Sequence, residues 1–307
     1  MKVAQSNAHG DKLSALLINT KLPESDRTRV ENAIGRYKDW VASLDAVNGA
    51  ADAILTQLVD LLAAYKRFIE LELIYDSDSD FLYRQKGQLK LDNTILEEFL
   101  PRLFDDRLIP GFARLRNIAC GPRASYAGLT FDSPFMALSS GGAYIKLKDQ
   151  DFSVNKAHRL SITEIPPTED SFSVDVSVSY FATEIKTNLD KTMFQEAAQT
   201  AGELKRAVSG CKYILLCEYL DMTPINTKLT PIDEVIVLRK AKRLSSNIRE
   251  NFSTAKGRQA YRARYIDFLD RHPLRKECFR RFIEHLNECF PTAEADQEDV
   301  VLGRGYF

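Results

Sequence analysis

The segment SFSVDVSVSYFATEIK, residues 171–186, constrains the fold of this chain more than any other stretch. Apolar and polar residues alternate along it, and β-branched and aromatic side chains are frequent, which is typical of a β-strand. Residues 190–208 then have helical spacing, and two apolar strands follow, KYILLCEYL and DEVIVLR. This order of strand, helix and strands predicts an α/β fold with a mixed central sheet flanked by helices.

Shorter strands and loops are expected before this unit. We predict separate strands at AYIKLK, DFSV and RLSIT, as antiparallel neighbours of the long strand. Residues 109–142 are rich in Gly, Pro and Ser, and we expect loops there. The helix at 190–208 should be capped by Asn188 or Asp190 and should end before Gly210.

Helices are expected in the N-terminal part of the chain. Apolar residues recur at spacings of three and four, as in the run from Ile54 to Ile69. The acidic stretch YDSDSDFLYRQKGQ should be a surface connection. DNTILEEFLPRLF should be a helix that Asp92 or Asn93 caps and that Pro101 interrupts.

The C-terminal part is strongly basic and again helical. From Arg239 to Arg281 there are fourteen Lys and Arg residues against four acidic ones, 14 − 4 = +10, although the whole chain has a net charge of −1. One face could therefore hold a polyanion. Tyr261, Tyr265 and Phe268 share a helical face and should pack inward. The arginines alone then remain as candidates for phosphate contacts, namely Arg249, Arg258, Arg262 and Arg264.

These patterns divide the chain into three parts: a helical region at 1–90, an α/β core at 91–240 and a basic helical region at 241–307. No apolar stretch follows Lys2, and no run approaches the roughly 20 apolar residues of a membrane span. We expect a cytoplasmic protein that does not enter a membrane. The five cysteines are odd in number and never form CxxC, which indicates reduced, buried thiols.

Two pairs of charged residues are candidates for chemistry. Glu184 and Lys186 stand two residues apart near the end of the long strand, so they project from one side of it. Asp149 and Asp151 stand two apart at the start of an earlier strand, which could pair with the first. A second carboxylate thus becomes available beside Glu184.

Such a set suits the hydrolysis of a phosphodiester, which needs an activated water and a way to neutralise charge on the phosphate. Mg²⁺ prefers oxygen ligands and keeps several waters, so Asp151 and Glu184 would suffice as its anchors. Lys186 would orient the attacking water and stabilise the negative transition state.

Purely structural explanations remain open for all of these residues. Glu and Lys on a solvated sheet face usually form an exposed pair of little value. Glu97 or Glu98 could hold a metal-bound water, but an acid that is solvated, or that the helix dipole favours near the helix N-terminus, is the commoner case. Four residues near the C-terminal end could bind zinc, although their spacing is loose and buried thiols are more typical of a core; they are His272, Cys278, His285 and Cys289.

The sequence also resembles a known family. KDQDF, the ExK triplet, MFQEAAQTAGELKRA, CKYILLCEYL and LTPIDEVIVLR are similar to the subunits of BbvCI and its relatives, which are restriction endonucleases. The resemblance is strong from Asp149 to Arg239 and implies a PD-(D/E)XK nuclease core with helical additions at both ends. It places Asp151, Glu184 and Lys186 at the catalytic positions and makes the carbonyl of Ile185 a further metal ligand. Gln150 replaces the Pro of the family motif, so Asp149 competes with Asp151.

The function that the resemblance implies is that of a Type II restriction endonuclease, which cleaves double-stranded DNA at a short specific site with Mg²⁺. Each active site would cut one strand, so a homodimer or a heterodimer with a related subunit is expected, together with a cognate DNA methyltransferase. Two alternatives stay open: a DNA-binding partner subunit with a vestigial metal site, and a PD-(D/E)XK nuclease of repair or phage defence without a fixed site.

Overall fold

The computed structural model describes residues 7–131, 143–163, 172–292, 302–303 and 305. One five-stranded sheet has the order β1-β2-β3-β4-β5. Neighbours are antiparallel from β1 to β3 and parallel from β3 to β5, so the predicted mixed sheet is confirmed. The strands are β1 (Ile118–Phe131), β2 (Ala143–Ile162), β3 (Phe172–Leu189), β4 (Lys212–Leu220) and β5 (Glu234–Lys242).

Helices precede, interrupt and follow these strands. None of the described helices is long and apolar enough to cross a membrane. In chain order the helical elements are α1 (Ala8–Leu17), α2 (Glu24–Asp45), α3 (Ala51–Arg67), the π-helix η1 (Phe68–Tyr75), α4 (Phe81–Gln85), α5 (Asn93–Phe99), η2 (Leu100–Leu103), η3 (Pro110–Arg114), α7 (Lys191–Ala207), η4 (Thr227–Leu229), α8 (Ser246–Arg249), η5 (Glu250–Ser253), α9 (Ala255–Arg271) and α10 (Lys276–Cys289).

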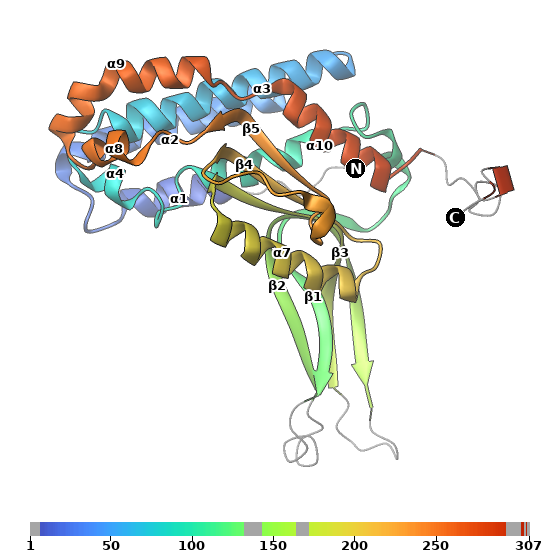
Figure 1. The fold of residues 1–307 in the computed structure, drawn as a ribbon. Helices are drawn as coiled ribbons and strands as arrows, with labels where there is room; N and C mark the ends of the chain where they lie inside the picture. The colour runs from blue at the N-terminus through green and yellow to red at the C-terminus, as the bar shows by residue number, and fades with distance from the viewer. Residues whose placement is uncertain (1–6, 132–142, 164–171, 293–301, 304, 306–307) are drawn as a thin grey trace.

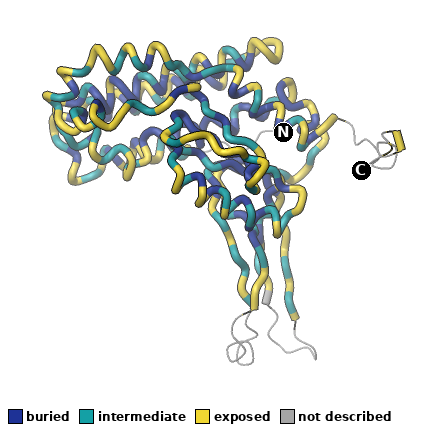
Figure 2. The backbone as a smooth tube through the Cα atoms, in the orientation of Figure 1, coloured by how far each residue is buried: buried dark blue, intermediate teal, exposed yellow. Residues whose placement is uncertain are grey.

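The sheet separates two apolar cores. On one face α7 packs against β3 and β4 through residues such as Phe194 and Leu215. On the other face Ile185 and Leu216 join the large core of α2, α3, α5 and α10. Figure 1 shows this helical body above the sheet, α7 below it, and the far ends of β1, β2 and β3 projecting away. Figure 2 shows that buried residues concentrate in the body rather than in that projection.

Two predictions about strands were wrong. AYIKLK, DFSV and RLSIT belong to one strand, β2, because their polar breaks continue the ladder with β1 or β3. The segment Ile118–Phe131, expected to be loops, is β1. Its Gly121 and Gly128 have φ of +130° and +150° and lie at irregularities of the ladder, where glycine is tolerated. The SSGG run at 139–142 lies outside the described residues.

The predictions about helix ends were confirmed in part. Asp190, and not Asn188, caps α7, where its carboxylate accepts a hydrogen bond of 2.9 Å from the Met193 N–H. Pro101 lies in η2, where α5 gives way to a tighter turn. Neither Asp92 nor Asn93 caps α5 with its side chain, and both have other contacts described below.

Four buried charges join the helical body to the sheet. Lys66 of α3 lies 2.8 Å from Glu218 of β4 and 3.5 Å from Glu70. Arg239 of β5 contacts both Glu218 and Glu70 at 3.0 Å. The two cations and two anions balance, and removal of one partner would leave a buried ion at a cost of roughly 3–5 kcal/mol. The network therefore fixes how α3 and η1 sit on β4 and β5.

The acidic stretch after η1 is not only a surface connection, because Ser77 is buried and its hydroxyl donates to Asp26 at 2.7 Å. Arg258 of α9 is 1% exposed. Its guanidinium donates hydrogen bonds to four backbone carbonyls, those of Tyr75, Ser77, Ser79 and Phe252. Arg258 is thus a structural residue, and its assignment as a phosphate contact was wrong. Tyr265 and Phe268 pack inward as predicted, against Tyr75 and Tyr219 respectively.

We predict that His9 makes stability depend on pH. Its ring contacts the hydroxyls of Tyr65 and Thr94, and burial, with the charge of Lys66, lowers its pKa to about 3. The unfolded chain, with a His pKa of about 6.5, therefore takes up the proton first as pH falls. The free energy of unfolding should decrease below about pH 6.5 by up to ~1.4 kcal/mol per pH unit from this group.

Urea denaturation at about pH 7.5 and about pH 5 measures this effect. His9→Gln should lose less stability over that interval than the wild type does. Equal losses in the two proteins would contradict the assignment.

Candidate functional site

The candidate site lies where the ladder between β2 and β3 ends. Phe152 of β2 pairs with Thr183 of β3, and beyond this pair β3 continues beside β4. On the β2 side, the backbone N–H and C=O of Ile185 form hydrogen bonds with side chains instead of with a strand. Its N–H donates to Asp151 at 2.8 Å, and its C=O accepts from the Asn93 amide at 3.3 Å. Three elements, β2, β3 and α5, therefore converge on one residue of the ExK triplet.

The structure places the two competing aspartates differently. The Asp151 carboxylate is half-buried and reaches β3 through the Ile185 N–H. Asp149 is exposed and stands in register with Ala124 of β1. An irregularity of the β1–β2 ladder lies next to this segment, so strict alternation fails there. Within the described contacts, Asp151 is the aspartate that joins the ExK strand.

Glu184 and Lys186 lie on one face of β3, as their spacing predicts. The Lys186 Nζ is 2.7 Å from one Glu184 carboxylate oxygen. The Tyr213 hydroxyl of β4 donates to the other oxygen at 2.8 Å. These contacts hold the carboxylate in one orientation, while the side chains of Glu184 and Lys186 keep 20% and 26% of their surface accessible.

The charges at this site oppose one another. Burial raises the pKa of Asp151, the Ile185 N–H and Lys186 act against the rise, and Glu184 adds to it. Burial also disfavours the charge on Lys186. The hydrogen bond and charge of Glu184, helped by Asp151 and Glu196, outweigh that effect and hold the Lys186 pKa above its usual value. Lys186 is therefore an ammonium at neutral pH.

Asn93 is a site residue that the sequence analysis assigned only to a helix cap. Its amide N–H₂ donates to the Ile185 carbonyl, and its amide oxygen accepts from the Thr187 hydroxyl at 2.7 Å. Asn93 thus holds alternate residues of β3 against the start of α5. Tyr213 was also missed, although its place in an apolar strand two positions before Leu215 is consistent with the Glu184 face. Neither residue has a signal in the sequence, because both contacts depend on pairing between distant segments.

The two glutamates of α5 have different roles. Both are buried, so neither is a solvated helix acid. Glu98 is 3% exposed and binds the backbone N–H of His9 and the Tyr37 hydroxyl, so it anchors α1 and α2. Glu97 is 8% exposed, and burial together with the charge of Asp151 raises its pKa to about 7. Glu97 is therefore the α5 carboxyl whose charge interacts with Asp151 of the candidate site.

The donor set fits a hard divalent cation. Asp151, Glu184 and the Ile185 carbonyl offer only oxygen, which is what Mg²⁺ prefers, and Mg²⁺ needs few protein ligands because it keeps waters. Burial raises the pKa of the half-buried Asp151 carboxylate, and a cation bound to it would favour its charged form. In the described part of the chain, no group of three or more His, Cys, Asp and Glu side chains is clustered closely enough for a metal ion. A cation here would thus depend on water and on the backbone carbonyl.

The other sequence candidates do not converge on this site. The His285 ring lies 2.9 Å from a Glu234 oxygen, and the Cys278 thiol donates to the Val237 carbonyl. Arg262 forms a two-pronged ion pair with Asp76. Arg264 is exposed on α9, and Arg249 lines a pocket beside the candidate site. All five cysteines are free, and four of them are buried, in agreement with the prediction.

A solved structure shares this fold. The chain is similar to "native BbvCI A2B2 tetramer at low resolution" with a TM-score of 0.51 and 22% sequence identity, over 83% of this chain and 93% of that one. The class of the fold is therefore that of this structure, a mixed open sheet with flanking helices, as predicted.

A family model narrows this class. The model of the Bpu10I restriction endonuclease matches residues 88–307, which is more than half of the chain. The chain belongs to the Bpu10I restriction endonuclease family. No curated protein matches it. The predicted resemblance to BbvCI and its relatives is confirmed.

The two aspartates allow a matched test of the metal site. We expect Asp151→Asn to weaken binding of Mn²⁺, used as a stand-in for Mg²⁺, by about tenfold or more, because a neutral amide replaces a charged oxygen ligand. Asp149→Asn should bind Mn²⁺ as the wild type does, since Asp149 is exposed and makes no described contact with β3. Isothermal titration calorimetry of both variants measures the difference. Loss of binding in Asp149→Asn alone would reverse the assignment.

Proposed function

We propose that this protein is a Type II restriction endonuclease that hydrolyses one phosphodiester per active site in double-stranded DNA, with Mg²⁺, at a specific short site. The observation that supports this most is the convergence of Asp151, Glu184 and Lys186 at the end of the β2–β3 ladder. Membership of the Bpu10I restriction endonuclease family supports the same chemistry.

In this proposal Asp151, Glu184 and the Ile185 carbonyl hold the cation. When bound, Mg²⁺ would supply a polarised water and positive charge beside the phosphate. Lys186 carries its own positive charge, which would orient the attacking water and stabilise charge on the phosphate oxygens. Tyr213 and Asn93 act indirectly, because they fix the Glu184 carboxylate and the Ile185 carbonyl. Glu97 would hold a water on the α5 side.

A cut through both strands needs two such centres. We propose that this chain acts as a homodimer, or as a heterodimer with a related subunit, and that a cognate DNA methyltransferase protects the host sites. The similar solved protein is described as an A2B2 tetramer, which favours assembly with a related subunit.

We expect Lys186→Ala to lower the rate of Mg²⁺-dependent DNA nicking by about a hundredfold or more, because it removes the ammonium beside the scissile phosphate. DNA binding should remain. Lys191→Ala, at the exposed first position of α7, is the matched control and should cut as the wild type does. A plasmid nicking assay and a gel-shift assay measure the two properties.

The same assays distinguish the alternatives. Unchanged cutting by Lys186→Ala would contradict the assignment of Lys186. DNA binding by the wild type without any nicking, even beside its related subunit, would indicate a partner with a vestigial site. A smear of plasmid fragments instead of discrete bands would indicate a nuclease without a fixed site.

A further inference from the structure

A pocket of about 220 Å³ opens beside the candidate site and is not used in the proposed reaction. Thr187 and Asn188, which directly follow Lys186 on β3, form part of its wall. Thr187 is joined to the Ile185 carbonyl through the two hydrogen bonds of Asn93. The pocket and the candidate metal site therefore share one strand and one positioning residue.

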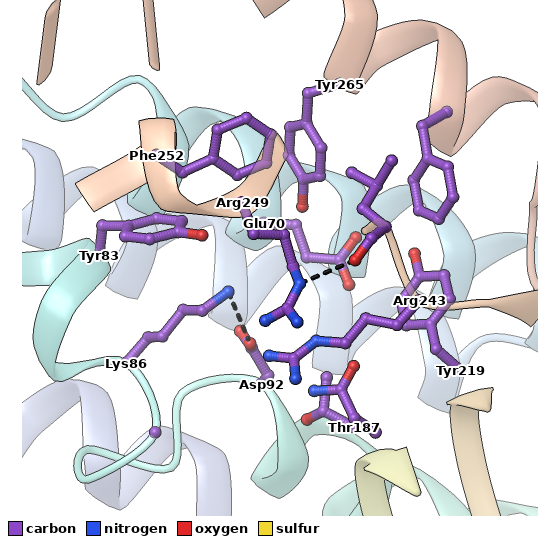
Figure 3. A pocket seen from close by; sticks show the side chains of 14 residues that line it. Glu70, Tyr83, Lys86, Asp92, Thr187, Tyr219, Arg243, Arg249, Phe252 and Tyr265 are labelled. Atoms are coloured by element: carbon purple, nitrogen blue, oxygen red, sulfur yellow. Dashed lines mark hydrogen bonds and ion pairs between the residues drawn. The ribbon is translucent and has the colours of Figure 1, made fainter. Parts of the chain in front are cut away.

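Three cations line this pocket: Lys86, Arg243 and Arg249. The guanidinium groups of Arg243 and Arg249 point toward each other across it (Figure 3). Arg243 contacts Asp221 at 3.1 Å, whereas Arg249 is 4.0 Å from the same carboxylate. Burial, together with the positive charge of Arg243, lowers the pKa of Arg249. One aspartate thus serves two arginines, and an anion between them would relieve their repulsion.

The two carboxylates of the pocket wall both have cationic partners. Glu70 is bound by Arg239 and Lys66 in the buried charge network. Asp92 faces Lys86 at 3.8 Å through one oxygen. Its other oxygen is buried and has no hydrogen-bond partner in the described part of the chain.

Aromatic rings form the opposite wall. Tyr83, Phe252 and Tyr265 line it in a row above the two guanidinium groups (Figure 3). Phe252 and Tyr265 are held by contacts with Tyr75, at centroid distances of 5.0 and 4.4 Å, so the wall is preformed. A cationic floor and an aromatic wall together suit a ligand that carries both a phosphate and a flat ring.

We propose that this pocket binds one nucleoside monophosphate unit, with the phosphate on Arg243 and Arg249 and the base along Tyr83, Phe252 and Tyr265. The unit is either a nucleotide of the DNA strand unstacked next to the cutting centre or a free nucleotide. The first source rests on the proposed function, because it requires DNA to lie across β3.

The test measures binding by the full-length chain without divalent metal. The probes are 2′-deoxyadenosine 5′-monophosphate and a single-stranded oligodeoxynucleotide of mixed sequence. Arg249→Ala should weaken binding by roughly tenfold to a hundredfold, since it removes a charged hydrogen-bond donor. Arg206→Ala, on the exposed face of α7, is its control and should bind as the wild type does.

A second variant fills the pocket and leaves every charge in place. Gly87 lines the pocket and a Cβ there would meet nothing within 4 Å, so Gly87→Trp can fold and adds bulk at the pocket wall. Gly210→Trp is the matched control, because a Cβ at Gly210 also meets open space. Circular dichroism of all four variants verifies folding.

Loss of oligonucleotide binding in both pocket variants, without displacement by the free nucleotide, identifies the DNA strand as the source. Loss of binding of the free nucleotide in the same variants identifies a small-molecule site. The proposal is overturned if Arg249→Ala and Gly87→Trp bind both probes as tightly as the wild type does. It is also overturned if the wild type binds neither probe. Binding is measured without divalent metal and without cutting, so absence of nicking by the wild type leaves this test intact, and a failure of the proposed cutting reaction is distinguishable from a failure of this pocket.

Discussion

The early end of the β2–β3 ladder is the constraint on which the site depends. The N–H and C=O groups of a strand inside a sheet form hydrogen bonds with the neighbouring strands, so none of them is available to a ligand. After Thr183, β3 keeps β4 on one side and loses β2 on the other. The backbone of Ile185 becomes available there, and Asp151 and Asn93 use it. The same interruption lets Glu184 and Lys186 stay partly accessible at the edge of a buried sheet.

Much of this arrangement could be predicted from the sequence because it depends on local periodicity. The alternation along β3 places Glu184 and Lys186 on one face, and the helical spacing after Asp190 gives the crossover to a parallel β4. The inward packing of Tyr265 and Phe268 follows from their spacing on α9. The function of a restriction endonuclease was predicted from the resemblance to a family, because the spacing of three residues alone does not indicate it.

The rest depends on contacts between distant segments. Asp149 and Asp151 carry the same side chain, and only the pairing of β2 with β1 and β3 distinguishes them. Arg258 looks like any other residue of a basic stretch until the chain from Tyr75 to Ser79 folds around its guanidinium. β1 was predicted to be loops because glycine and serine are typical of turns, whereas Gly121 and Gly128 lie at irregularities of a ladder.

We propose that Asp151, Glu184 and the Ile185 carbonyl together hold a divalent cation at the end of this ladder. Anomalous X-ray diffraction from crystals of the protein soaked in Mn²⁺ is the sharpest test of this site. One strong peak is expected within about 2–2.5 Å of oxygens from all three residues. A peak on Asp149, or a bound ion elsewhere with none between Asp151 and Glu184, would contradict it.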